Sequence, residues 1–524
     1  MDAARKALVG MNEERRLAQL LMVGYPGTKP PSSLLRWIEE RGIGGLKIFG
    51  WNAQDTKILA EAVRTAQDKA LASSSSIPLL VATDQEGGWI RHVKGSTSES
   101  PGAMAIGATR SARDAYLAGY HIGKELSLLG IRMNFAPVAD LATEPDSSII
   151  GPRAFSDDPE LAARLASSFA KGSLAAGVIP TAKHFPGHGA TRLDSHGALP
   201  KVDVDPATFR QRELRPFAVL AKAAIPAMMT GHLAFPLLTG KPEPASLSRA
   251  LIQGELRGRL RYRGLVITDD LYMAGASAGS SMLDTCLSAI KAGNDMILLS
   301  SLPDFDGNLW AGLSKAYGSD AEFRMRVDES AVRILATKLL HLGPAGAAGL
   351  LPDPGTVEAV LPDPEAQAFF ADLAWRSVTL VKGSAHAFAP EGPVLIAAPF
   401  GEFLDLGASR YSDARLFRFS GGLASAADPD ELRAFSGALE EAEAAIICVG
   451  SGSGLQFAEA ARRSGKEFAV ISVLSPAIIR HIQGARTILA VYHYAPACLE
   501  AGFLALSGRI PARGRLPLSA RTMR

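Results

Sequence analysis

Eight short apolar runs recur through the first three hundred residues, and this repetition constrains the fold more than any other feature of the chain. Amphipathic segments with the apolar spacing of helices separate the runs, for example 114–129 and 159–176. The runs cover 20–25, 45–49, 79–83, 133–138, 179–184, 227–232, 265–269 and 295–299. Eight strand–helix alternations predict an α/β fold, a parallel (β/α)8 TIM-like barrel, with a doubly wound open sheet as the alternative.

The chain is long enough to require a second domain, because 524 residues exceed what one ordinary hydrophobic core holds. Composition shifts to Gly, Ala and Pro between 343 and 363, which is typical of a linker. Further apolar runs follow at 378–381, 394–398, 445–450, 468–474 and 487–492. We therefore predict a catalytic barrel over 1–345, a linker over 346–365 and a smaller α/β sandwich over 366–524.

The overall composition excludes several classes of partner. A net charge of +2 gives no reason to expect nucleic acid or an anionic membrane. The three cysteines lie far apart and have neither disulfide-framework nor metal-ligand spacing. No apolar stretch is long enough to span a bilayer, and residues 1–14 lack the apolar core of a signal peptide. We expect a cytoplasmic protein, although a leader that had been removed would leave the same sequence.

Polar side chains gather at the carboxyl ends of the predicted strands, where a β/α barrel carries its catalytic groups. They are Asp84 after the third run, Asn134 and Asp140 around the fourth, Lys183 and His184 at the end of the fifth, His232 at the end of the sixth and Asp269 at the end of the seventh. The opposite ends of the same runs are poor in such groups. This asymmetry predicts an active site at one face of the barrel.

One loop is unusually rich in titratable groups. Residues 183–189 read Lys-His-Phe-Pro-Gly-His-Gly, and Asp194-Ser195-His196 follows shortly. Its histidines and aspartate, together with His232, are zinc-compatible donors, but the helical His-x-x-x-His pattern with a glutamate is absent. A glycine-rich turn at 450–454 lacks the complete dinucleotide fingerprint. We therefore expect neither a metal nor a cofactor.

Taken one at a time, several of these residues have two interpretations. Asp269, next to Asp270, is either a nucleophile or a helix-capping acid. Asp84, before two glycines, is either a ligand for sugar hydroxyls or a turn residue, and Arg91 is either a clamp or a surface charge. Arg153 fits a structural ion pair equally well. His232 fits a buried, satisfied histidine equally well.

Taken together, the motifs resemble glycoside hydrolase family 3, in its β-N-acetylglucosaminidase branch, over nearly the whole chain. The resemblance rests on residues 18–24, 84–91, 133–138, 183–189, 194–196, 229–232, 245–248, 266–271 and 514–517. The histidine-rich run followed by Asp-Ser-His is the most specific of these motifs. Ala154, Ser156 and Tyr272 depart from the usual pattern without touching the proposed chemistry.

The resemblance implies roles for particular residues. Asp269 matches the family's nucleophile, His196 its general acid/base, and Asp194 the residue that orients that histidine. A retaining glycosidase needs such a nucleophile and acid/base pair, and the ordinary imidazole pKa of about 6.5 suits proton exchange near neutrality. The residues matched to terminal-sugar binding are Asp84, Arg91, Arg153, Lys183 and His184, and we add His232 as a substrate contact.

The expected function is therefore a retaining, exo-acting β-N-acetylglucosaminidase. Its substrate would be a small carbohydrate that carries terminal N-acetylglucosamine, from cell-wall muropeptides during recycling or from chitin oligosaccharides. A phosphorylase that passes the sugar to phosphate, or a broad-specificity β-glucosidase of the same family, is the alternative. A non-catalytic sugar-binding protein is disfavoured because Asp194, His196 and Asp269 are all present.

Overall fold

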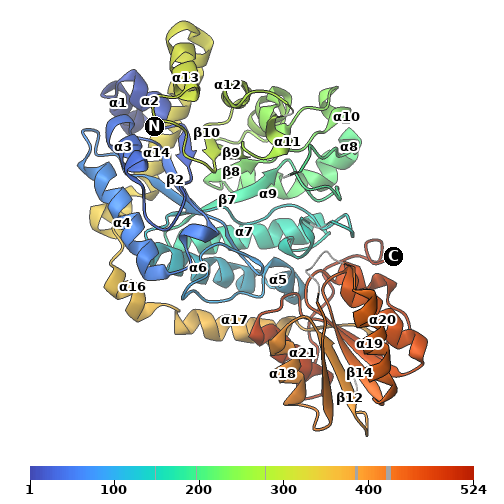
Figure 1. Ribbon diagram of the computed structural model, residues 1–524. Helices are drawn as coiled ribbons and strands as arrows, with labels where there is room; N and C mark the ends of the chain where they lie inside the picture. The colour runs from blue at the N-terminus through green and yellow to red at the C-terminus, as the bar shows by residue number, and fades with distance from the viewer. Residues whose placement is uncertain (148, 196, 278, 384–387, 421–425) are drawn as a thin grey trace.

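A closed parallel barrel forms the first part of the chain in the computed structural model, which describes residues 1–147, 149–195, 197–277, 279–383, 388–420 and 426–524 (Figure 1). Its strands are β1 (Leu21–Val23), β2 (Gly45–Ile48), β3 (Leu80–Thr83), β6 (Met133–Asn134), β7 (Ile179–Phe185), β8 (Ala227–Thr230), β9 (Leu265–Asp270) and β10 (Met296–Leu299). They close in the order β1-β10-β9-β8-β7-β6-β3-β2. The predicted TIM-like barrel is confirmed, and the doubly wound alternative is wrong.

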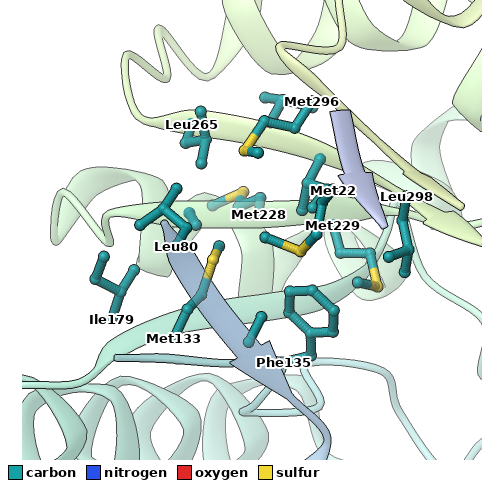
Figure 2. Close-up of a cluster of buried hydrophobic side chains, with 14 of the residues drawn as sticks. Met22, Leu80, Met133, Phe135, Ile179, Met228, Met229, Leu265, Met296 and Leu298 are labelled. Carbon is teal, nitrogen blue, oxygen red and sulfur yellow. The ribbon is translucent and has the colours of Figure 1, made fainter. Parts of the chain in front are cut away.

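The interior of the barrel is filled with side chains, many of them methionines. Figure 2 shows Met22, Met133, Met228, Met229 and Met296 among aliphatic side chains and Phe135. All of these methionines are buried. Methionine is unbranched and flexible, so it fills irregular gaps in a core. Gly45 leaves room for one of them, because a Cβ at that position would lie 2.6 Å from the Met22 Cε atom.

Helices surround the barrel (Figure 1). They are α1 (Asp2–Val9), α2 (Glu13–Ala18), α3 (Ser32–Arg36), α4 (Thr56–Ala72), α5 (Ala103–Thr109), α6 (Ala112–Leu128), α7 (Pro159–Ala175), α8 (Pro206–Thr208), α9 (Arg215–Lys222), α10 (Pro236–Thr239), α11 (Ala274–Ser277), α12 (Met282–Ala292), α13 (Asn308–Ser319) and α14 (Ala321–His341). The helix α6 begins where the Ser111 side chain accepts the Asp114 N–H, and α7 begins at the Asp158 cap. These two helices coincide with the predicted segments 114–129 and 159–176.

The segment after the barrel is helical and packs on the barrel. It contains α15 (Gly346–Leu350), α16 (Pro354–Val360) and α17 (Pro364–Ser377). Helix α16 lies against α4, where the Lys57 and Glu358 side chains form an ion pair of 2.7 Å. Val357 and Leu361 are buried in the same core cluster as the barrel. The domain boundaries at 345 and 366 stay a prediction.

A mixed sheet forms the second domain. Its strands are β11 (Thr379–Gly383), β12 (Val394–Ala398), β13 (Ala414–Arg418), β14 (Ala444–Val449), β15 (Glu467–Ser472) and β16 (Thr487–Ala490), in the order β11-β16-β15-β14-β12-β13. Strand β11 pairs antiparallel and the others pair parallel. The helices α18 (Gly401–Ala408), α19 (Pro429–Glu440), α20 (Gly452–Ser464) and α21 (Pro496–Leu506) accompany it. Because separate apolar clusters lie on its two faces, the predicted smaller α/β sandwich is confirmed.

The two domains share an apolar contact close to the mouth of the barrel. The barrel contributes Met104, Ala105, Ala108, Ala142, Ile150 and Ala154, and the second domain contributes Ala477, Ala490, Tyr492 and Leu518. Arg376 of α17 adds two hydrogen bonds to the Asp114 carboxylate, at 2.6 and 3.1 Å. Among the helices of the described ranges, none has the length and apolar character needed to cross a bilayer.

Candidate active site

Asp84 is held in place by two buried lysines, and the three residues come from the carboxyl ends of three different barrel strands. It follows β3 directly and accepts hydrogen bonds from Lys47 of β2, at 2.5 Å, and from Lys183 of β7. Burial alone would raise the pKa of Asp84, but the ammonium groups of Lys183 and Lys47 hold that pKa well below its usual value. The residue is therefore an ionised acceptor at the mouth of the barrel.

Glu86 joins the same group of charges from the short hairpin of β4 (Gln85–Gly87) and β5 (Ile90–Arg91). Its carboxylate lies 2.6 Å from the Lys183 Nζ and accepts a bidentate pair of hydrogen bonds from Arg153, at 2.9 and 2.7 Å. Burial alone lowers the pKa of Lys183, but Asp84 and Glu86 raise it above its ordinary value. Arg153 and Lys183 are thus fixed donors that face one space.

Sequence reasoning missed Glu86 and Lys47 as site residues. Both had a detectable signal: Lys47 interrupts an otherwise apolar strand, and Glu86 lies two residues after Asp84 in the same motif. A lysine in a buried strand needs a charged partner, which in this protein is Asp84.

His184 is oriented by a buried carboxylate. Its Nδ1 lies 2.6 Å from the Asp140 Oδ2, and Asp140 also accepts the backbone N–H groups of His184 and His188. Burial alone raises the pKa of Asp140, but His184 and His188 bring it below its ordinary value. The ionised acid fixes the Nδ1–H tautomer of His184. The other ring nitrogen, Nε2, then lies 3.5 Å from the Arg153 Nη2.

Asp269 is the penultimate residue of β9, on the same face of the barrel. Burial alone would raise the pKa of Asp269. The nearby imidazoles of His184 and His232 instead hold this pKa below its ordinary value, and the Asp270 N–H and the Lys183 ammonium add to the effect. An ionised carboxylate at the carboxyl end of a barrel strand is suited to nucleophilic attack. Its neighbour Asp270 accepts the N–H groups of Tyr272 and Ser300, so this second acid holds the backbone that follows β9 and β10 rather than capping a helix.

His232 supports the end of that strand. Its Nε2–H donates to the Asp270 carbonyl at 2.9 Å, and its Nδ1 lies 2.8 Å from the Ser246 hydroxyl. Both ring nitrogens are therefore engaged within the protein, and burial lowers the pKa, so the ring is neutral. This geometry suits a residue that positions Asp269 through the backbone. Its direct contact with substrate stays a prediction.

The loop after β7 carries the predicted acid/base pair. Asp194 lies in this loop, next to Ser195, whose hydroxyl is 3.4 Å from the His188 Nε2. The Ser195 carbonyl accepts the Gly275 N–H at 3.0 Å, which ties the loop to the segment after β9. Burial lowers the pKa of His188 to about 4, so this histidine is neutral. His196 lies outside the described residues, and its role stays a prediction.

The Arg91 side chain, on β5 next to the Asp84 cluster, pairs with residues outside that cluster. Its guanidinium pairs with Glu99 at 2.9 Å and donates to the Thr97 carbonyl at 3.2 Å. Its predicted contact with the sugar stays a prediction. Within the part of the chain that the structure describes, no group of His, Cys, Asp and Glu side chains forms a metal-binding cluster.

The barrel thus brings most of the predicted residues to one place. Asp84, Lys183, Arg153 and His184 are linked through Glu86 or directly, and Asp269 interacts with His184 and Lys183 across the mouth. Such an array of fixed charged donors and acceptors beside an ionised carboxylate suits a ligand with many hydroxyl groups.

Comparison with known proteins agrees with this geometry. A family model described as the glycosyl hydrolase family 3 N terminal domain matches residues 13–337. The chain belongs to glycoside hydrolase family 3. The predicted family is therefore confirmed, and with it the prediction of a glycoside hydrolase.

This family 3 chain is similar to curated and structurally solved relatives. It is 34% identical over 379 residues to "Beta-hexosaminidase A" of Pseudoalteromonas piscicida, a match that covers 68% of this chain and 62% of that protein. It is 34% identical to a "Beta-hexosaminidase" of Idiomarina loihiensis over 53% of this chain and 83% of the relative. A solved family 3 β-N-acetylglucosaminidase from Paenibacillus sp. superposes with a TM-score of 0.87 at 30% identity, covering 97% of this chain and 99% of the other.

Proposed function

We propose that this family 3 chain is a retaining, exo-acting β-N-acetylglucosaminidase that releases terminal N-acetylglucosamine. The observation that carries the proposal is the position of Asp269, an ionised carboxylate at the end of β9 facing the Asp84–Glu86–Lys183–Arg153 cluster. The names of the curated and solved relatives support the choice of N-acetylglucosaminide. We also propose that the enzyme acts in the cytoplasm, in muropeptide recycling or in the turnover of chitin oligosaccharides.

In the first half of the proposed reaction, an Asp269 oxygen attacks the anomeric carbon of the terminal sugar. The bond from that carbon to the leaving-group oxygen breaks, and His196 donates a proton to this oxygen. The product is a covalent glycosyl-enzyme ester on Asp269. Asp194, two residues from His196, orients the imidazole and stabilises its charged form.

In the second half, water attacks the same carbon from the side that the leaving group vacated. His196, now neutral, accepts the proton of that water, and the ester bond to Asp269 breaks. Two inversions give retention of the β configuration. Throughout, Asp84 and Arg153 with Lys183 and His184 hydrogen-bond the sugar hydroxyls, so that the ring is held against Asp269.

The test is hydrolysis of an N-acetyl-β-glucosaminide by wild type and by Asp269→Asn, with and without inorganic phosphate. We expect free N-acetylglucosamine as the main product in both media and a loss of at least 10³-fold in kcat for Asp269→Asn. Sugar 1-phosphate as the main product would instead identify a phosphorylase. Faster cleavage of a β-glucoside than of the N-acetylglucosaminide would identify a broad-specificity β-glucosidase.

A further inference from the structure

The loop after β7, which carries Asp194, rests at its start on the segment that follows β6. The Glu144 N–H donates to the Gly189 carbonyl at 3.1 Å. A Cβ at Gly189 would lie 1.8 Å from the Leu141 carbonyl oxygen, so the two backbones touch. Only glycine fits this approach, and the start of the loop therefore lies directly against residues 141–146.

Arg192 adds two ion pairs between the same two segments. Its Nε lies 3.0 Å from the Glu144 Oε1, and its Nη2 lies 3.3 Å from the Asp146 Oδ2. Glu144 also accepts the Asp146 N–H at 3.1 Å, so the two acids are held side by side. Arg192 stands two residues before Asp194, which orients the general acid in the proposed reaction. These pairs therefore restrain the part of the chain that leads to the proton donor.

The second domain reaches the same acid with an arginine of its own. Arg480 lies in the 3₁₀ helix η8 (Pro476–His481) and pairs with the Asp146 Oδ1, while Arg192 pairs with Oδ2. The hydrogen bond from Arg480 lowers the pKa of Asp146, although burial opposes this change. One ionised carboxylate thus joins an arginine of the second domain to an arginine of the loop. We call the series Arg480–Asp146–Arg192 the ion-pair bridge.

The two ends of the ion-pair bridge differ in how firmly they are held. The Arg480 side chain is 8% exposed, and its Nη1–H donates to the Ala477 carbonyl at 2.8 Å. Ala477 belongs to the apolar contact between the two domains. The Arg192 side chain, by contrast, is mostly exposed. Arg480 is therefore the fixed end of the bridge, and Arg192 is the end that the bridge restrains.

The later part of the loop is held by a different segment. The Gly275 N–H donates to the Ser195 carbonyl at 3.0 Å. A Cβ at Gly275 would lie 2.8 Å from that oxygen and 3.0 Å from the Ala198 carbonyl oxygen. Gly275 follows β9, the strand of the proposed nucleophile. Asp194 thus lies between two anchors, the ion-pair bridge and the segment after β9.

The energetic consequence of such a bridge is local. Exposed ion pairs contribute little to the stability of a whole protein. A general acid, however, must lie within hydrogen-bonding distance of the leaving-group oxygen, and a displacement of about 1 Å can lower a rate about 100-fold. A restraint on this loop therefore affects proton transfer more than it affects folding.

We propose that Arg480 and Arg192 are positioning residues, through which the second domain holds the loop after β7 in place for proton transfer to the leaving group. The inference rests on the proposed function, and it gives the second domain a part in the reaction without any contact with the sugar. Arg480 fixes Asp146, Asp146 holds Arg192, and Arg192 restrains the loop that carries the proposed acid/base pair.

The test compares two substrates that share the terminal sugar and differ in their need for an acid. The alcohol that leaves N,N′-diacetylchitobiose must be protonated, whereas 2,4-dinitrophenolate leaves the corresponding aryl N-acetyl-β-glucosaminide as an anion. We expect Arg480→Gln to lower kcat/KM for the disaccharide about 5-fold and to change kcat/KM for the aryl glycoside by less than about 2-fold. Arg480→Lys, which keeps the charge, should recover part of the loss.

A double-mutant cycle tests whether the two arginines act through Asp146. Arg192→Gln alone should show the same selective loss for the disaccharide. The double variant Arg192→Gln/Arg480→Gln should lose no more than Arg192→Gln does, because Arg480 then has no arginine in the loop to restrain. Losses that multiply in the double variant would show two independent effects and would overturn the ion-pair bridge.

The matched control is Arg486→Gln, which removes an ion-paired arginine elsewhere in the second domain. Arg486 directly precedes β16 and pairs with Glu467, the first residue of β15. These residues lie at the amino ends of their strands, whereas η8 follows the carboxyl end of β15. The control should cleave both substrates as wild type does.

The outcomes separate the ion-pair bridge from the activity. Wild type that cleaves neither substrate would overturn the proposed function, and equal losses for both substrates in His196→Gln would overturn the proposed acid. A selective loss in His196→Gln without one in Arg480→Gln would overturn the positioning role alone. Equal losses for both substrates in Arg480→Gln would also overturn that role, because they would indicate a general weakening of domain docking.

Discussion

At the scale of single residues, the mouth of the barrel concentrates five ionisable side chains in one connected group, three of them buried and two partly buried. Ion pairs join them one after another: Lys47 pairs with Asp84, Asp84 with Lys183, Lys183 with Glu86, and Glu86 with Arg153. Burying charges is costly unless each is paired, so such a group contributes little net stability. If the proposed sugar binds there, the donors and acceptors are already fixed in place, so that they need little reorganisation during the reaction.

Glu86 is the member whose removal should be most damaging to this group. Glu86→Gln keeps the shape but leaves Lys183 and Arg153 with one fewer buried counter-charge. We expect the free energy of unfolding to fall by about 3 kcal/mol. Urea denaturation would measure this loss, and we also expect a higher KM. The control is Glu358→Gln, which removes the exposed pair with Lys57 and should change stability by less than about 1 kcal/mol. Equal effects of the two variants would contradict the structural argument.

The pH dependence of the reaction should follow from the low pKa of Asp269. Its carboxylate is favoured in the folded protein, so protonation removes the nucleophile only below its ordinary pKa of about 3.9. With His196 as the acid, kcat/KM for a disaccharide should be flat from about pH 5 to 6 and fall above about pH 6.5. His196→Gln should abolish the alkaline fall. A loss of kcat/KM with a midpoint near pH 6 on the acid side would contradict this assignment.

The residues that sequence reasoning identified are those whose type is unusual at their position. Asp84, Lys183 and Asp269 lie at the ends of apolar runs, where a charged side chain stands out from its neighbours and, if buried, needs a partner or a ligand. The bidentate Arg153–Glu86 pair was not predictable in the same way. It joins residues 67 positions apart, and only the closed barrel brings them together. Contacts of this kind depend on tertiary structure rather than on local pattern.

At the scale of elements, burial decides which strands the sequence reveals. The eight barrel strands were predictable because they are apolar and, apart from the two polar residues that end β9, buried throughout. Strand β13 was missed, since it lies at the edge of the second sheet with a largely exposed Ala-Arg-Leu-Phe-Arg sequence. The β4–β5 hairpin was missed because its strands are two and three residues long.

Close packing of α6 on α7 depends on glycine. A Cβ on Gly119 of α6 would lie 2.1 Å from the Phe169 carbonyl oxygen of α7, so Gly119→Ala must push the helices apart. We expect a destabilisation of about 1–3 kcal/mol, measured by urea denaturation. Gly437→Ala on α19 is the opposite case, because nothing lies within 4 Å of its Cβ position. There the better helix propensity of alanine should stabilise the protein by about 0.5–1 kcal/mol. If both variants changed the free energy of unfolding in the same direction, this reasoning would be wrong.

At the scale of the whole molecule, the second domain supports a loop of the active site. Its residues Tyr492 and Leu518 pack on Ile150 and Ala154, which flank Arg153 in the sequence. Arg153 itself donates to the carbonyl of Ile149, within the supported segment. We therefore expect the position of Arg153, the arginine proposed to bind the sugar, to be coupled to domain docking.

Leu518→Asp tests this coupling. It buries a carboxylate in the apolar contact between the domains, at a position that is 6% exposed. We expect calorimetry to resolve two unfolding transitions, and we expect KM to rise by a factor of about 3–10. Leu416→Asp on the exposed face of β13, which is 49% exposed, should alter neither quantity. A single unchanged transition in Leu518→Asp would show that the domains do not depend on this contact.

The closure of the barrel also has a consequence for its synthesis. Strand β1 pairs with β2 on one edge and with β10 on the other. In the pairing with β10, Leu21 lies opposite Ile297, Met22 opposite Leu298 and Val23 opposite Leu299. A ribosome adds about 5–20 residues per second, so one edge of β1 waits for its partner for on the order of tens of seconds. During that interval an apolar strand edge is open to pairing with other chains. Chaperone demand for this protein should therefore be greatest just before the last barrel strand leaves the ribosome.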